Sequence, residues 1–596
     1  MTHEARLFLS QDEWEKLSDK RSDPYLDRIA ENNMQVLDLL EERVQNIGVY
    51  TTHWRSDPPW RILKARVLRR TAAWYLTRDE QHLEVLSDCV RWFSSAENWQ
   101  ESWGKPMLNH YGLTKGDMTY CLTFLLDACG KYLSDADRTA LCDALRNLAL
   151  AHYIEGFDAG EWWRHCDFNW SSATHANAAL GALYIQPENP DLAAEVRRRA
   201  HDGLGFVIDN FPIGGGWTEG LMYQTTTMAH LSDYVMALHR VEGNDLGLSE
   251  NRNFIDTLDY RLYMMGGDDK PVNFSNCNEG SGEYFMPQAF WWAKHLNRPD
   301  WMAFEEAHTK DFHDSHGLFH DIEAFWCRPV NPEKAEARLK PLKHFKGLDW
   351  MKWTGEKTWF ALRSGYNGGN HNNLDLGHFV FGAGEDRFLC DPGYGASATK
   401  QHNAAIFRGA SQAVASTAEI IRLHPVGKGG FYLCCDLAET YPHVLAHYYR
   451  HVLLIDEEDL LVIDHALAKK GHRLGAKWNL QTRLPFEKSE SGATFKGEQK
   501  TLQLQFLTPT HDQATEEDAV GKAAFWSLMW SPRVDLPSHC SAMYFSLKPK
   551  EARFERQKDL AVFNLGNREY IIDLAEACMI QPPRDVSTEN ALGIGR

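Results

Sequence analysis

The chain has 596 residues, of which 43% are hydrophobic and 24% are charged, and its formal net charge is −19. This length exceeds what one hydrophobic core usually supports, so two or three domains are expected. The acidic balance argues against a general nucleic-acid binder, because phosphate binding needs a basic surface, and no segment approaches the roughly 20 consecutive apolar residues of a membrane span.

The start of the chain and its cysteines bear on cellular location. MTHEARLFLSQDEWEKL contains no basic segment followed by an apolar run, so no secretory signal is expected and a cytoplasmic location is predicted. If a leader had been removed, the periplasm would be the expected location instead. The 12 cysteines show no CxxC spacing, which favours reduced thiols over a disulfide scaffold.

The first half of the chain has the pattern of packed helices. In SDADRTALCDALRNLALAHYIEGF, Ser134 and Asp137 have the spacing of a capping box, leucines recur on one face, and Gly156 lies near the end. Similar amphipathic blocks recur to about residue 325. They predict antiparallel helix pairs in either an open solenoid or a closed α/α toroid. The absence of a strict sequence period disfavours the solenoid.

The second half has the pattern of strands. Residues 327–347 contain three prolines and many charges, which is typical of a linker. Short runs rich in aromatic and β-branched residues follow, and HVLLIDEEDLLVID predicts a hairpin that turns at residues 456–459. We therefore predict an α/α toroid over 1–326 and an antiparallel β-sandwich over 348–596, with a site in the cleft between them.

A segment around Asn169 could carry chemistry. In HCDFNWSSATHANAALGALYI, a predicted helix of small residues is preceded by four polar or aromatic residues, Asn169, Trp170, His175 and Asn177. Asparagine is a common helix N-cap, so capping and polar satisfaction of the core are the ordinary explanation of this segment. Aromatic faces also stack on sugar rings, which makes Trp170 a candidate substrate contact as well as a candidate core anchor.

A glycine-rich loop leads into a second candidate segment, GGGWTEGLMYQTTTMAHLSDY. Trp217 and Glu219 follow three glycines, and Tyr223 lies one helical turn after Glu219, so these two side chains can share a face. His230 and Tyr234 come later on the same predicted helix. A buried aromatic is the ordinary interpretation of Tyr223, but the arrangement could also present a proton-transfer group.

The third candidate segment is HNNLDLGHFVFGAGEDRFLCDPGYG, residues 371–395. His371 and Asn373 would point to the same face if the chain is extended there, with Asp391 on the next strand and His402 on the following segment. Histidine, aspartate and histidine from neighbouring strands suit a divalent ion such as zinc, and the oxygen of Asn373 could join them. A hydrogen-bonded His–Asp network explains the same residues equally well.

Together these segments resemble the heparinase II/III-like superfamily of polysaccharide lyases. The resemblance covers most of the chain and lies in FNWSS, GGGWTEGLMY, NDLGLSENRNFIDTLDYRLYMMG and the segment 371–395. The last is similar to a family pattern, H-x-H-x-x-D-x-G-x-F, followed by a strand ending in Asp-x-G. Asn373 departs from it, because a second histidine is usual there and is a metal ligand in zinc-bearing members. The resemblance implies an N-terminal α/α toroid, a C-terminal antiparallel β-sandwich and β-elimination at a uronic acid residue, giving a 4,5-unsaturated sugar.

The resemblance also implies roles for individual residues. The C5 proton of a uronate becomes acidic only when the neighbouring carboxylate is neutralised, and Asn169 with His371 would do this. Tyr223 would protonate the departing O4 and could also act as base, while His371 is the expected base if the two roles are divided. Tyr234 is the alternative tyrosine, and Glu219 would orient other groups. The expected substrate contacts are Trp170, Trp217, Glu219, His230 and Tyr394.

A metal ion is a further expectation from the resemblance. His402 with Asn403 resembles the family element that supplies a later ligand, and His424 is an alternative because the interval from Asp391 is short. The expected ligands are His371, Asn373, Asp391 and His402. Because Asn373 replaces a histidine, the ion is expected to be weak, absent or harder than zinc, with manganese as the alternative. Its role would be structural, and no organic cofactor is expected.

Other function classes remain open. A glycoside hydrolase on an α/α toroid would need two carboxylic acids, for which Glu219 and Asp167 are candidates. A sugar-binding protein without activity is a third interpretation. For a lyase, the sequence does not choose among heparan sulfate, chondroitin, hyaluronan and alginate, and either a monomer or a homodimer is compatible with it. The apparent lack of a leader favours small imported oligosaccharides, and no nucleic-acid or membrane partner is expected.

Overall fold

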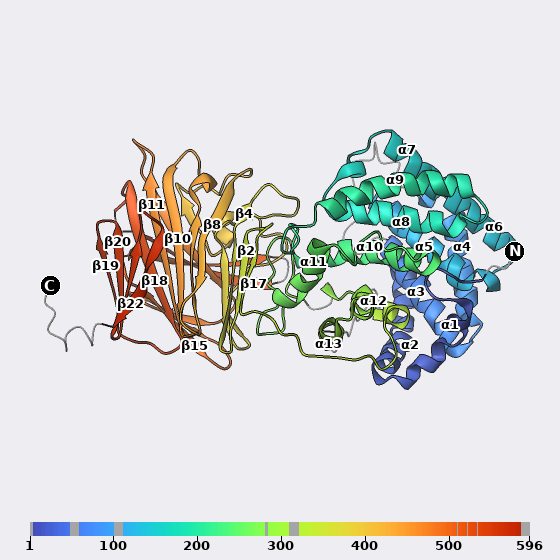
Figure 1. Ribbon diagram of the computed structural model, residues 1–596, viewed down its shortest axis with the longest axis horizontal. Coiled ribbons are helices and arrows are strands. Elements are labelled where there is room, and N and C mark those ends of the chain that lie inside the picture. Colours follow the sequence, from blue (N-terminus) through green and yellow to red (C-terminus); the bar gives the residue numbers. More distant parts are fainter. Residues whose placement is uncertain are drawn as a thin grey trace. The chain divides into compact units, whose positions relative to one another are not determined.

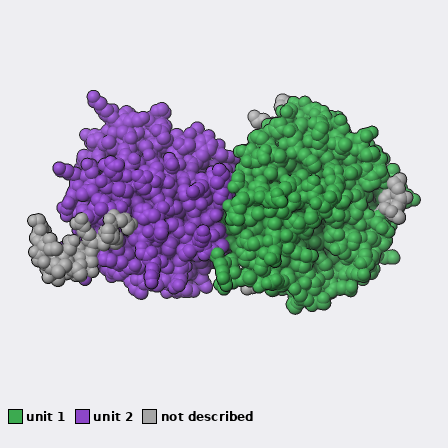
Figure 2. Space-filling model, viewed as in Figure 1, with its two compact units in different colours: residues 1–211, 222–262, 281–338 green, residues 212–221, 263–280, 339–596 purple. Residues whose placement is uncertain are grey.

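A computed structural model describes residues 4–47, 59–99, 111–280, 284–308, 321–508, 510–520, 523–532 and 534–585. The chain forms two compact units (Figure 2). The first comprises residues 1–211, 222–262 and 281–338, and the second comprises residues 212–221, 263–280 and 339–596. The limits 1–326, 327–347 and 348–596 stay a prediction. Two segments from the helical half of the sequence, 212–221 and 263–280, belong to the second unit.

The first unit is helical. Its helices, of which α1 to α13 are labelled in Figure 1, are α1 (Gln11–Glu15), α2 (Pro24–Ile47), α3 (Pro59–Thr77), α4 (Gln81–Ser94), α5 (Leu113–Cys129), α6 (Asp135–Ala144), α7 (Ala151–Asp158), α8 (Asn169–Ile185), α9 (Pro190–Asp209), α10 (Leu221–Glu242), α11 (Arg252–Tyr263), α12 (Gln288–His295), α13 (Pro299–Ala307) and α14 (Ala324–Cys327). Consecutive helices pack in pairs, such as α3 with α4 and α8 with α9. Helices α5 and α8 are buried on nearly every side, whereas α4 and α9 bury only one face. Inner and outer helices of this kind fit the predicted toroid.

The predicted capping residue is correct, but the predicted helix is not continuous. Ser134 precedes α6, and its Oγ accepts a hydrogen bond from the backbone N–H of Asp137 at 3.1 Å. A π-helical turn over Leu145–Leu150 then separates α6 from α7. Among the described residues, no helix combines the length and apolarity that crossing a membrane requires.

The second unit is built of β-strands. They are β1 (Leu342–Phe345), β2 (Trp350–Thr354), β3 (Thr358–Arg363), β4 (Gly365–Tyr366), β5 (Phe379–Ala383), β6 (Asp386–Leu389), β7 (Ala405–Phe407), β8 (Thr417–Pro425), β9 (Phe431–Asp436), β10 (Leu445–Ile455), β11 (Asp459–Ala468), β12 (Ala476–Thr482), β13 (Phe486–Ser489), β14 (Gly492–Lys496), β15 (Thr501–Phe506), β16 (Thr510–Val520), β17 (Ala523–Pro532), β18 (Ser538–Ser546), β19 (Ala552–Gln557), β20 (Leu560–Leu565), β21 (Arg568–Asp573) and β22 (Cys578–Asp585). The predicted hairpin is confirmed, because β10 pairs antiparallel with β11 from Leu445 to Ile455. Asp456 and Glu457 both have positive φ in its turn.

Four sheets make up the second unit, with strand orders β1-β2-β3-β5-β6, β13-β14-β15-β18-β11-β10-β9-β8-β4, β16-β17-β12-β7 and β19-β20-β21-β22. The nine-stranded sheet is a middle layer, because successive residues of its strands enter different cores. Val452 packs in the larger core, whereas Leu453 packs in a second core with Phe563 and Ile572 of the β19–β22 sheet. The predicted antiparallel sandwich therefore carries an additional layer.

Candidate active site and metal centre

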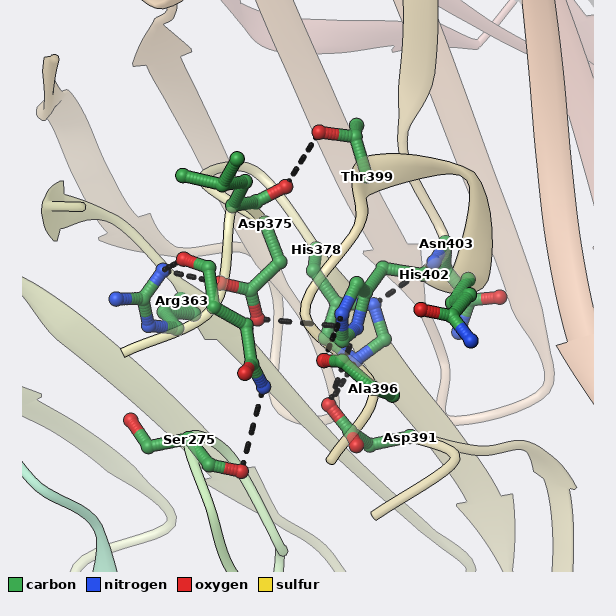
Figure 3. Close-up of polar contacts among 12 residues, drawn as sticks. Ser275, Arg363, Asp375, His378, Asp391, Ala396, Thr399, His402 and Asn403 are labelled. Atoms are coloured by element: carbon green, nitrogen blue, oxygen red, sulfur yellow. Dashed lines mark hydrogen bonds and ion pairs between the residues drawn. The ribbon is translucent and has the colours of Figure 1, made fainter. Parts of the chain in front are cut away.

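Three buried side chains converge beside the first β-strands of the second unit (Figure 3). His378 directly precedes β5, Asp391 follows β6, and His402 lies between a short 3-10 turn and β7. His378 Nε2 lies 3.1 Å and His402 Nδ1 lies 3.4 Å from Asp391 Oδ2, and all three side chains are fully buried. Their ligand atoms lie within 4.8 Å of one another, so this buried cluster could hold a metal ion.

Each of the two histidine rings also has a hydrogen bond at the nitrogen that faces away from Asp391. These bonds determine which ring nitrogen carries the proton. His402 Nε2 lies 3.0 Å from the carbonyl oxygen of Ala396, so it must carry a proton, which leaves a lone pair on Nδ1 when the ring is neutral. His378 Nδ1 accepts from the backbone N–H of Asn403 at 2.9 Å, so a neutral ring carries its proton on Nε2, directed at Asp391. A cation would therefore be held by Asp391 and His402, with His378 as an N–H donor to Asp391.

Further polar groups lie around the cluster. Asp375 forms a buried ion pair with Arg363, and its Oδ2 lies 3.8 Å from His402 Nδ1. Asn373 donates from Nδ2 to the carbonyl oxygen of Ser275 at 3.3 Å, while its buried Oδ1 has no hydrogen-bond partner among the described residues. Such an unsatisfied oxygen fits a site that receives another ligand.

The pKa values follow from this arrangement. Burial alone raises the pKa of Asp391, but hydrogen bonding and charge from His378 and His402 bring it below its usual range. Burial lowers the pKa of His378. It also opposes protonation of His402, but the carboxylates of Asp375 and Asp391 raise the pKa of that ring overall.

His371 lies apart from this cluster. Its backbone is left-handed, with φ of 58°, and its carbonyl oxygen accepts from the N–H of Asn276 at 3.1 Å. Nδ1 lies 3.2 Å from Nδ2 of Asn276, and Nε2 lies 3.7 Å from Oε1 of Glu219. Burial lowers the pKa of His371 to about 4, so the imidazole is neutral at neutral pH. His371 and Asn373 are thus not members of the close-packed trio, and the third member is His378, which the sequence analysis did not select.

Glu219 lies beside His371 and is hydrogen-bonded to Trp217. Glu219 is fully buried, and its two carboxylate oxygens accept from Nδ2 of Asn370 at 2.7 Å and from the indole N–H of Trp217 at 3.0 Å. Trp217 is itself only 2% exposed. Gly220 has φ of 86°, and a Cβ there would lie 2.5 Å from the carbonyl oxygen of Phe274, so this turn needs glycine.

In the first unit the predicted residues lie on α8 and α10. Asn169 is the buried first residue of α8, and Trp170 is partly exposed with its ring centroid 4.5 Å from that of Trp162. Tyr223 is partly exposed in the first turn of α10. His230 is buried near Asp117 and Asn177.

Tyr234 lies in the core of the first unit. Its hydroxyl lies 2.6 Å from Nε2 of His201, and burial raises its pKa to about 12. Of the two tyrosines on α10, Tyr223 is the partly exposed one. In the second unit, Tyr394 is 41% exposed in the loop after Asp391. His424 is on β8 and is not a member of the trio.

No family model and no curated protein matches the sequence. Solved structures do match. Heparan sulfate lyase HepC from Pedobacter heparinus has a TM-score of 0.60 at 14% identity, over 90% of this chain and 84% of that one. Heparinase III, the BT4657 gene product, has a TM-score of 0.62 at 12% identity, over 91% and 90%. A Paenibacillus xanthan lyase has a TM-score of 0.56 at 10% identity, over 94% and 63%.

The chain has the heparinase III fold. The predicted fold class, a helical region followed by antiparallel β-sheets, is thereby confirmed. At these identities the likeness concerns the fold of polysaccharide lyases alone.

Several polar residues of this heparinase III fold were not predicted. Asn276 and Asn370 contact His371 and Glu219, and they lie 95 and 151 residues from these partners in sequence. One sequence carries no signal for such pairings. The sequence contained a weak signal for His378, because this residue lies in the segment 371–395 and directly precedes a run of apolar strand residues.

Proposed function

We propose that this protein is a polysaccharide lyase that cleaves a uronate-containing polysaccharide or oligosaccharide by β-elimination, as a carbon–oxygen lyase. The observation that carries the proposal is the likeness to heparinase III and HepC over nine-tenths of the chain, together with the family motifs at Asn169, Tyr223 and His371. The product would carry a C4=C5 double bond on its new non-reducing end.

Each proposed role follows from the chemistry of its side chain. The amide of Asn169 and the imidazole of His371 would bind the uronate carboxylate and reduce its charge, which makes the C5 proton acidic. The phenol of Tyr223 would protonate O4 as the C4–O4 bond breaks. Glu219 would not react, because it is buried and both its oxygens accept hydrogen bonds from Trp217 and Asn370.

A divalent ion would have a supporting role. Asp391 and His402 would hold it, with the unsatisfied oxygen of Asn373 as a candidate third ligand. One nitrogen and two oxygens form a harder ligand set than a zinc site with two histidines, so manganese suits it better. Such an ion would hold the loop between β6 and β7 in place. Its role would be structural and electrostatic, and it would not activate a water molecule.

The alternative of a glycoside hydrolase is weaker. Inverting and retaining hydrolases need two carboxylic acids on either side of the scissile bond. Glu219, the stronger acid candidate, has both oxygens occupied by Asn370 and Trp217 in a buried position. The uronate itself stays open between a glycosaminoglycan, such as heparan sulfate, chondroitin or hyaluronan, and alginate.

A panel of uronate polymers and their oligomers tests the proposal. Product absorbance at the ultraviolet edge should rise with at least one of them, and Tyr223→Phe should lower kcat about 100-fold or more, the usual contribution of a positioned acid. Tyr184→Phe, a change of the same kind at a partly exposed tyrosine of α8 with no proposed role, is the matched control and should retain most of the activity. No absorbance with any polymer or oligomer would contradict a lyase, and full activity of Tyr223→Phe would remove Tyr223 from the mechanism.

A further inference from the structure

The surface of the first unit carries a group of exposed aromatic rings. Trp162 lies in the connection between α7 and α8, and it is 49% exposed. The ring of Phe168 lies nearly parallel to it, with centroids 5.7 Å apart at an interplanar angle of 18°, and the ring centroid of Trp170 lies at 4.5 Å. Phe168 and Trp170 are themselves partly exposed. We call these three side chains the aromatic platform.

Trp162 is held in place by its neighbour in sequence. It is the first residue of a 3-10 turn, Trp162–His165, and the next residue, Trp163, is fully buried. The indole N–H of Trp163 donates to Oε2 of Glu161 at 2.6 Å, and its ring stacks on that of Tyr153 with centroids 5.5 Å apart. Because Trp163 fixes the turn from the core side, Trp162 is presented to solvent in a defined position.

A buried histidine joins this turn to α8. His175, within α8, has Nδ1 2.6 Å from the hydroxyl of Tyr153 and Nε2 3.2 Å from the carbonyl oxygen of Arg164. A carbonyl oxygen only accepts, so Nε2 carries the proton and Nδ1 accepts from the tyrosine, which satisfies both nitrogens of a neutral imidazole. Burial lowers the pKa of His175 to about 4, in agreement with the neutral form. The aromatic platform and Asn169, the first residue of α8, are therefore tied together within the first unit.

The size and position of the aromatic platform favour a sugar over another protein as its ligand. A specific protein partner usually covers about 800 Å² on each side, which is more than three partly exposed side chains provide. A flat aromatic face, by contrast, matches the C–H face of a pyranose ring, and a ring that is already ordered loses little entropy on binding. Phe168 and Trp170 are the residues on either side of Asn169 in the chain. A polysaccharide whose uronate carboxylate is bound by Asn169 would therefore have neighbouring sugars close to these rings.

We infer that the aromatic platform is a sugar-binding subsite, in which one face of a pyranose stacks on the exposed ring of Trp162. The inference rests on the proposed lyase function, in which Asn169 binds the uronate. Phe168 and Trp170 pack beside the ring of Trp162 and connect it with Asn169. Stacking acts on the bound substrate before and during the reaction alike, so the subsite affects KM and leaves kcat nearly unchanged.

Chemical oxidation of tryptophan tests the contact directly. Among the residues whose side chains the structure describes, the exposed tryptophans are Trp162 and Trp526, and Trp526 lies on β17 of the second unit. N-Bromosuccinimide should oxidise both indoles, which peptide mass mapping would detect. Saturating oligosaccharides of hyaluronan, chondroitin, heparan sulfate or alginate, added to Tyr223→Phe to prevent cleavage, should protect Trp162 and leave Trp526 as reactive as before. Equal oxidation of Trp162 with and without an oligosaccharide that binds would overturn the inference.

Substitutions measure the contribution of the Trp162 ring. Trp162→Ala should raise KM, and the Kd measured in the Tyr223→Phe background, roughly 10-fold, the effect of losing about 50 Å² of apolar contact. Its kcat should change little. Trp162→Phe keeps an aromatic ring and should retain most of the affinity, whereas Trp526→Ala is the matched control and should behave as the wild type. An unchanged KM and Kd for Trp162→Ala would refute the subsite and leave the lyase intact.

The outcomes separate the subsite from the reaction. Binding of an oligosaccharide that protects Trp162 but is not cleaved by the wild type would contradict the proposed lyase function and leave the subsite standing. Cleavage by the wild type, with Trp162 unprotected in the bound complex, would do the reverse. If none of the four kinds of oligosaccharide bound, both the subsite and the proposed function would be overturned.

Discussion

The buried histidine His451 should make the second unit sensitive to acid. It lies on β10, is 1% exposed, and its Nδ1 is 2.9 Å from the hydroxyl of Tyr432. Burial, followed by the nearby His465 and His447, lowers its pKa to about 3, whereas an unfolded histidine titrates near 6.5. Between these two values the unfolded chain binds a proton that the folded chain does not. Stability should therefore fall as the pH decreases from about 6.5 toward 3.

The size of the loss in unfolding free energy follows from the width of the pH interval. Two pH units, from about 6.5 to about 4.5, correspond to roughly 2.7 kcal/mol of unfolding free energy at 1.36 kcal/mol per unit. His451→Gln keeps a polar side chain that does not titrate, so its loss of unfolding free energy should be smaller than that of the wild type by about this amount, even if the variant is less stable overall. His443→Gln, a change of an exposed histidine in the same unit, should leave the loss unchanged.

Urea unfolding at the two pH values measures the effect, and hydrogen exchange of the β10 amides assigns it to the second unit. The quantity to compare is the difference in unfolding free energy between the two pH values, not the stability at either one. Equal losses in the wild type and in His451→Gln would refute the reasoning.

Three further changes test other parts of the structure. Mn²⁺ added at 100 times its dissociation constant should raise the unfolding free energy of the wild type and of His378→Gln by about 2.7 kcal/mol. It should not raise the unfolding free energy of His402→Gln. An equal response of the two variants to Mn²⁺ would contradict the assignment of His378 as a hydrogen-bond donor. Gly220→Ala should lower stability by about 1–3 kcal/mol in thermal unfolding, because it forces a side chain into a left-handed turn against a carbonyl; an unchanged midpoint would contradict this. Lys64→Met should lower the unfolding free energy in urea by about 3 kcal/mol, because it leaves the buried carboxylate of Asp117 without its cation, whereas stabilisation would show that the pair is not needed.

The local sequence pattern predicted the fold well, because the spacing of apolar residues along the chain reflects which side chains are buried. The Ser134 cap, the hairpin at residues 456–459 and the change from helices to strands near residue 340 all follow from side-chain periodicity and turn residues. The outer β19–β22 sheet was not foreseen as a separate layer. Its strands have the same pattern as those of the sandwich, and only the tertiary packing assigns them to another core.

The site was predicted in part. Asp391 and His402 do meet, as strand order predicted. The prediction for His371 and Asn373 assumed an extended chain. That stretch is a loop, His371 has φ of 58°, and the first strand after it is β5. The alternation of faces therefore does not apply there. His378 takes the third position because it directly precedes β5 beside Asp391.

The mass and proton spectrum of the first product test the central claim most directly. A uronate polymer that this protein cleaves should give a fragment one water lighter than the hydrolysis product, with a vinylic proton at C4 of the terminal uronate. A saturated fragment with water added across the cleaved bond would contradict β-elimination and indicate a hydrolase.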